Sequence, residues 1–124
     1  MVNHRTIDDH NTTLSIEDFA VLRENLHEQR LFRREQLHQL SAAVTSRAGT
    51  PSARPAASQL EVRDKLAASA RLVLTDVEAA LGRMDQGRYG TCHLCRGPIA
   101  RELLMIVPQA RYCARCRQVR EAGR

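Results

Sequence analysis

Aromatic residues are scarce in this chain of 124 residues, which has two Phe, two Tyr and no Trp. Large aromatic side chains supply much of the apolar area that a globular core buries, so the scarcity argues against a large core. The length favours a single domain. Together these features predict one elongated helical protein rather than a compact globule.

Several other features are absent. No stretch approaches 18 consecutive apolar residues, so no membrane span is expected. Residues 1–9 contain no apolar segment of the kind that starts an export signal, which predicts a cytoplasmic protein. The sequence also lacks the GxGxxG, GxSxG, HExxH and P-loop patterns. No catalytic residue is therefore predicted, and we expect no enzyme activity.

The charge is distributed unevenly along the chain. The formal net charge is +5, and residues 87–124 carry eight Arg against only two acids. Residues 1–47 and 58–86 are each close to neutral. A basic segment of this kind can meet either nucleic acid or an acidic protein surface.

All four cysteines lie in that basic segment, as Cys92, Cys95, Cys113 and Cys116. They form two CxxC knuckles separated by 17 residues, a spacing typical of a four-thiolate zinc site. Two disulfides are the alternative, which the missing export signal disfavours. We predict one structural Zn²⁺ held by these four thiolates, with His93 outside the site. The segment between the knuckles is expected to form a short hairpin or looped strand.

A long helix is predicted to follow residues 1–14, which we expect to be a flexible N-terminal segment. Ser15 is a plausible N-cap, with acids in the first turn. No Gly or Pro occurs between Ser15 and Ala48, so one helix of about 30 residues is expected. Its apolar stripe, at a spacing of three and four, consists of Phe19, Leu22, Leu26, Leu37, Leu40 and Val44.

A second helix of similar length is predicted over residues 58–86, after a turn at about 48–57 that contains one Gly and two Pro. Ser58 and Glu61 form a capping box, and Gly87 stands where a helix-ending glycine is favoured. Its apolar stripe consists of Val62, Leu66, Ala70, Val73, Val77, Ala80 or Leu81, and Met84.

The predicted fold is mainly α, a long antiparallel two-helix coiled-coil hairpin over residues 15–86 followed by a zinc-finger module over 87–124. That module ends in a short basic C-terminal helix, Ala114 to Ala122. Because the turn is short and the helices match in length, we expect a hairpin within one chain, and hence a monomer. A bundle lacking its third helix, or a coiled coil completed by dimerisation, are the alternatives.

The order of helix, turn, helix and GxYGxCxxC…PxAxxCxxC resembles the DksA/TraR family of bacterial RNA polymerase regulators. The matching residues are Leu81, Gly87, Tyr89, Gly90, Cys92, Cys95, Pro98, Ile99, Pro108, Ala110, Cys113 and Cys116. The resemblance implies a cytoplasmic protein that binds RNA polymerase, inserts its coiled coil into the secondary channel, and alters initiation without binding a promoter.

The chain departs from the family pattern at two places. Studied members carry aspartates at the hairpin tip, whereas no acid occurs here between Glu35 and Glu61. An acidic, Mg²⁺-directed role therefore does not carry over. Members usually have Gly directly after the second cysteine, where this chain has Arg96; we expect Gly97 to make that turn. Guanosine tetraphosphate binding, known in some members, maps onto no residues here.

The candidate partner-binding residues are arginines: Arg47 and Arg54 at the tip, and Arg111, Arg115, Arg117 and Arg120 in the zinc module. The leading hypothesis is direct binding to RNA polymerase. The alternatives are a nucleic-acid-binding zinc module that uses the basic C-terminal region, and a coiled-coil adaptor for another protein.

Overall fold

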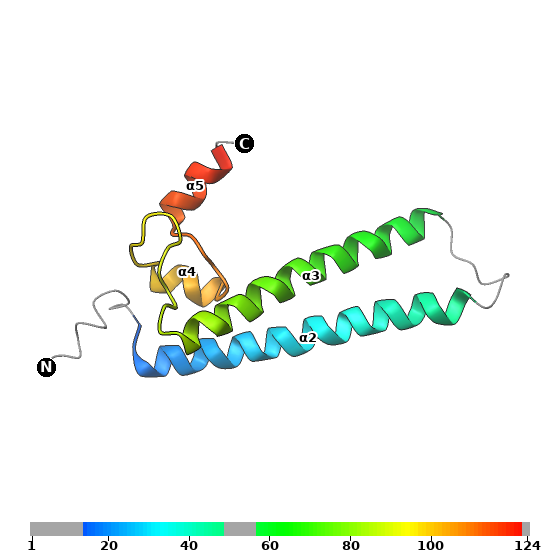
Figure 1. The fold of residues 1–124 in the computed structure, drawn as a ribbon, viewed down its shortest axis with the longest axis horizontal. Helices are drawn as coiled ribbons and strands as arrows, with labels where there is room; N and C mark the ends of the chain where they lie inside the picture. The colour runs from blue at the N-terminus through cyan, green and yellow to red at the C-terminus, as the bar shows by residue number, and fades with distance from the viewer. Residues whose placement is uncertain (1–13, 49–56, 123–124) are drawn as a thin grey trace, which may run out of the picture.

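The computed structural model describes residues 14–48 and 57–122, and within helix α2 it describes the side chains up to Ala42. The helices are α2 (Ile16–Ala48), α3 (Ala57–Asp85), α4 (Arg101–Ile106) and α5 (Ala114–Ala122). Figure 1 shows α2 and α3 running antiparallel, with α4 and α5 gathered where α2 begins and α3 ends. In these two ranges no strand forms, apart from an isolated antiparallel bridge between Thr91 and Pro98. None of the helices described combines the length and apolarity that a bilayer span needs.

Helix α2 begins at a reciprocal cap. The Asp18 N–H donates to Ser15 Oγ at 3.0 Å, and the Ser15 N–H donates back to Asp18 Oδ2 at 3.1 Å. Two backbone donors that the helix itself leaves unpaired are thereby satisfied. The prediction of Ser15 as N-cap is confirmed, and Asp18 proves to be the acid that completes the cap.

Leu22 and Leu26 of the predicted α2 stripe face α3, whereas the side chain of Val44 lies outside the described residues. Leu22 and Leu26 are fully buried, whereas Leu31 and Phe32, on a neighbouring face, are 65% and 62% exposed. Ion pairs cross from α2 to α3 between Arg23 and Asp85 at 3.1 Å and between Arg30 and Glu78 at 3.2 Å. Exposed pairs of this kind contribute little stability, but they show the antiparallel register of the hairpin.

The start of α3 differs from the prediction. The helix begins at Ala57, so Ser58 lies in its first turn and is not the N-cap. The alanines beside Ser58 are strong helix formers, and this propensity extends the helix beyond the apparent capping box.

The end of α3 is as predicted, with Gly87 in the left-handed conformation at φ 74°. The Gly87 N–H donates to the Met84 carbonyl and the Arg88 N–H to the Arg83 carbonyl, at 3.2 and 2.8 Å. This pair of bonds is the Schellman ending, in which glycine is favoured because it has no Cβ.

The core lies at the base of the hairpin. Both long helices and the zinc module contribute buried residues to one cluster: Leu22, Leu26, Val77, Ala80, Met84, Tyr89, Cys92, Ile99 and Leu104. Further out, the predicted stripe of α3 is less covered, since Val62 and Leu66 are 56% and 46% exposed. The hairpin is therefore fixed at its base rather than packed uniformly along its length.

The segment between the knuckles contains helix α4, so the expectation of a hairpin or looped strand was wrong. Leu104 of α4 is fully buried in the shared core. Arg101, the first residue of α4, forms a two-pronged ion pair with Asp18, with Nε–Oδ2 at 2.8 Å and Nη2–Oδ1 at 3.0 Å. The module is thus tied directly to the first turn of α2.

This ion pair predicts a pH effect. The hydrogen bond from Arg101, followed by the backbone N–H of Ser15, lowers the pKa of Asp18 to about 2 from an ordinary 3.8. Because the folded-state pKa is depressed, the stabilisation is complete above the ordinary value and is lost as the pH falls through about 2. Arg101→Gln should raise the Asp18 pKa toward 3.8, measured by NMR titration of its carboxyl carbon. Arg23→Gln, which breaks another α2 ion pair, should leave it unchanged; equal pKa values in both variants would contradict the assignment.

Candidate metal centre

The fold brings the four predicted cysteines together. Cys92 and Cys95 lie on the loop after α3, Cys113 directly precedes α5, and Cys116 lies in its first turn. All four Sγ atoms lie within 4.8 Å of one another, and Cys95 Sγ is 3.9 Å from Cys113 Sγ. A tetrahedron with Zn–S bonds of about 2.3 Å has edges of about 3.8 Å. The donor set and its spacing therefore fit one structural Zn²⁺.

Backbone N–H groups point at the sulfurs. The Gly97 N–H lies 3.4 Å from Cys95 Sγ, and the Cys116 N–H lies 3.4 Å from Cys113 Sγ. At Cys92, burial raises the thiol pKa, but backbone N–H groups, led by that of Cys95, outweigh it and lower the pKa to about 6. These donors stabilise thiolate, the form that binds metal.

The thiol of Cys116 is shifted in the opposite direction. The pKa of Cys116 is raised to about 12, chiefly by its hydrogen bond with Cys113 and then by burial. Four sulfurs this close cannot all be anionic unless a cation lies among them. Zinc supplies that charge, and four thiolates leave no open position for a reacting water. The centre is therefore structural.

The two knuckles are joined through the backbone. The Cys92 N–H donates to the Gly97 carbonyl at 2.8 Å, and the His93 N–H donates to the Arg111 carbonyl at 2.9 Å. The His93 ring lies edge-on to Tyr112, with centroids 6.0 Å apart. His93 is not part of the cysteine cluster, in keeping with the prediction that it is not a ligand.

The turn after the second cysteine corrects one expectation. Arg96 itself adopts the left-handed conformation, at φ 65°, whereas Gly97 has no positive φ. The Arg96 N–H donates to the Cys92 carbonyl at 3.0 Å, which holds the turn in place. The knuckle fixes this conformation at the residue after Cys95, so a glycine one position later cannot take it over.

Arg96→Gly should therefore stabilise the zinc-loaded protein by about 1 kcal/mol, since a residue with a Cβ is strained in this conformation. The Arg96 side chain is exposed, so little packing is lost with it. The measurement is urea unfolding with zinc present. Arg96→Ala, which keeps the Cβ, is the control and should show no such gain; an equal gain in both variants would point to the lost charge instead.

Tyr89 anchors the module to the hairpin. Its ring is 1% exposed and meets Phe19 of α2 edge-on, with centroids 5.7 Å apart. Its hydroxyl donates to the Pro108 carbonyl at 2.8 Å, and burial raises its pKa. The family pattern marked Tyr89, but the sequence did not reveal that it joins α2 to the loop before Cys113.

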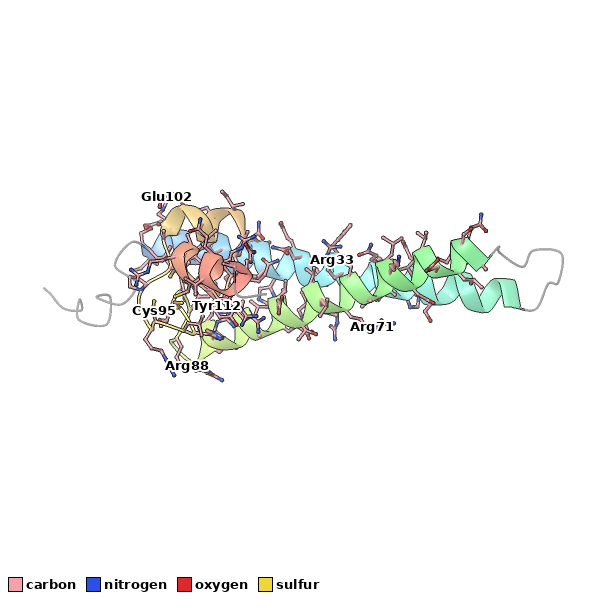
Figure 2. All side chains as sticks on the ribbon, turned by 90° about the horizontal axis from the view of Figure 1, so that it is seen from above. Arg33, Arg71, Arg88, Cys95, Glu102 and Tyr112 are labelled. Atoms are coloured by element: carbon pink, nitrogen blue, oxygen red, sulfur yellow. The ribbon has the colours of Figure 1, made fainter. Side chains whose placement is uncertain are left out.

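Three of the four module arginines predicted to contact a partner make side-chain contacts within the module. Arg111 and Arg120 lie over the ring of Tyr112, at 5.6 and 4.7 Å from its centroid, and Arg117 pairs with Glu121 at 3.3 Å. These three and Arg115 are exposed. Figure 2 shows Tyr112 and Cys95 together at the module end of the molecule. Of the tip candidates, Arg54 and the side chain of Arg47 lie outside the described residues.

Comparison with known proteins gives concordant findings. Residues 87–122 match the prokaryotic dksA/traR C4-type zinc finger. The chain is 34% identical over 65 residues to an uncharacterized protein of Aquifex aeolicus (strain VF5), covering 51% of this chain. It spans only 45% of that curated relative. The structure of transcription factor DksA2 from Pseudomonas aeruginosa shares the fold, with a TM-score of 0.74 and 19% identity over 99% of this chain and 92% of that one.

Proposed function

We propose that this chain, whose residues 87–122 match the prokaryotic dksA/traR C4-type zinc finger and whose fold is that of DksA2, is a transcription regulator that binds RNA polymerase directly in the cytoplasm. The observation that carries the proposal is the long hairpin mounted on the zinc module. Helix α2 has 33 residues, which corresponds to a length of about 50 Å. A thin projection of this length suits insertion into a deep channel, and the polymerase secondary channel is the proposed place. The protein acts there as a monomer.

The proposed effect on initiation differs from that of members with an acidic tip. Between Glu35 and Glu61 the sequence has Arg47 and Arg54 as its only charges. Such a tip repels rather than attracts a divalent cation at a polymerase active centre. The hairpin therefore acts by occupying the channel and contacting its walls, with no role in metal coordination.

The zinc module supplies the second proposed contact. Arg111 and Arg120 are held against Tyr112, so less side-chain freedom is lost when they meet a partner. Arg115 and Arg117 lie in the same helix as Arg120, with Arg117 paired to Glu121, and we propose that these four arginines meet an acidic region at the channel entrance.

The test is a binding and run-off transcription assay with purified RNA polymerase and zinc-loaded protein. We expect association with core enzyme and altered initiation. Arg47→Gln/Arg54→Gln should change the transcriptional effect more than binding, and Arg111→Gln/Arg120→Gln should weaken binding. Absence of any association with core or holoenzyme would refute the proposal.

Nucleic-acid binding is the second candidate, favoured by the four exposed arginines of the module. It predicts DNA or RNA affinity that falls steeply with salt, with a slope set by the number of phosphates neutralised. Measuring affinity across a salt series, with and without polymerase, separates the two candidates.

A further inference from the structure

A groove of about 330 Å³ lies on the side of the hairpin base, between the last turns of α3 and the first knuckle. Its lining consists of Ala79, Gly82, Arg83, Gln86, Arg88 and His93. None of these residues is acidic, and four of them carry nitrogen donors. The groove is therefore suited to a ligand that brings negative charge and hydrogen-bond acceptors.

Arg83 is the central residue of this groove. It is only 6% exposed, and the one hydrogen bond that its side chain makes in the described structure is long, from Nη2 to the Ala110 carbonyl at 3.5 Å. Among residues 14–48 and 57–122, no carboxylate forms an ion pair with it. Burial lowers its pKa, and the like charges of Arg111 and Arg88 lower it further, whereas Tyr89 and the negative charge of Asp76 act to raise it. Buried charges in proteins are normally paired directly, whereas in the described residues Asp76 acts on Arg83 only from beyond ion-pair distance, so its guanidinium could still take a carboxylate in direct contact.

Gly82 lacks a side chain and so leaves space within the groove. Glycine is among the least favourable residues inside a helix, and no turn or positive φ requires it here. No heavy atom lies within 4 Å of the place where its Cβ would stand, so no internal packing excludes a side chain. With Ala79 one turn away, the surface of α3 is low enough for another main chain to approach closely.

We propose that this groove binds an acidic protein segment, with a carboxylate placed against Arg83 and Arg88 and its main chain running over Gly82. A guanidinium matches a carboxylate with two parallel hydrogen bonds, and Gln86 and His93 offer further polar contacts. Arg88 Nε already donates to Gln86 Oε1 at 3.0 Å, which orients it at the rim. This proposal does not depend on RNA polymerase binding. The chain could fail to bind the polymerase and still bind an acidic peptide in the groove, or the reverse.

The probe is a fluorescently labelled hexaglutamate peptide, with binding to the full zinc-loaded chain measured by anisotropy. Gly82→Leu fills the groove without changing any charge and improves helix propensity, so it should fold. It and Arg88→Gln should each weaken binding roughly tenfold, the size expected for losing a hydrogen bond to a charged group. Arg71→Gln removes an equal charge from an exposed site further along α3 and should change affinity less than twofold (Figure 2).

Three outcomes would overturn the proposal. Equal affinities in all three variants would mean non-specific attraction to a basic protein. Displacement of the peptide by inorganic phosphate at equal concentration would indicate a small-anion site. The third outcome concerns Arg83→Gln, which removes both the charge and the two-pronged geometry. Faster zinc loss to a chelator with unchanged peptide affinity would show that Arg83 instead balances the zinc–tetrathiolate centre, whose net charge is about −2.

Discussion

Replacing Cys92 by serine should abolish zinc binding and unfold the module. Structural zinc contributes on the order of 10–16 kcal/mol in small zinc peptides, far more than any other single interaction here. Cys92 is also fully buried in the cluster that joins the module to Leu22 and Leu26, so its loss should loosen the hairpin base as well. Zinc content by metal analysis and thermal unfolding followed by circular dichroism measure the two effects. Cys113→Ser should behave in the same way.

His93→Ala is the matched control, because His93 lies in the same knuckle but outside the sulfur cluster. It should keep one zinc per chain and melt close to the wild type. If Cys92→Ser retained one bound zinc with an unchanged melting curve, the assignment of the metal centre would be wrong.

Leu26→Ala should destabilise the zinc-loaded protein by about 2–5 kcal/mol. The side chain is fully buried where α2, α3 and the module meet, and its truncation leaves a cavity in addition to the lost apolar contact. Zinc should remain bound, since the cysteines are untouched. Urea unfolding at saturating zinc gives the free energy of unfolding.

Leu31→Ala is the same truncation in the same helix, at a side chain that is 65% exposed. It should change the free energy of unfolding by less than about 0.5 kcal/mol. Similar values for the two variants would contradict the placement of the core at the base of the hairpin.

The features predicted correctly from the sequence are those that depend on local spacing. The two CxxC knuckles predicted the metal ligands because each places two sulfurs on one tight turn. Ser15 and Gly87 marked helix ends through chemistry confined to a few residues. The bounds of α5, Ala114–Ala122, also match the prediction. In each case the signal lies within one or two turns of chain.

The features that were missed depend on contacts across the fold. Asp18 and Arg101 are 83 residues apart, and nothing in either local sequence indicates that they pair. Helix α4 has six residues, too few for an apolar period to distinguish helix from strand. Arg96 takes its left-handed conformation from the closed knuckle, against its own preference. The groove around Arg83 appears only when α3 and the first knuckle are placed side by side.

Because the core is concentrated at one end, the hairpin is held at its base and projects from it. Because α2 is about 50 Å long, a rotation of the hairpin by ~5° about its base displaces the far end of the helix by ~4 Å. A small rotation caused by a substitution at Leu26, Tyr89 or the Asp18–Arg101 pair would therefore produce a larger displacement at the far end of the hairpin. The position of the far ends of α2 and α3 is therefore set by contacts at the base, so substitutions at the base can move those ends without touching them.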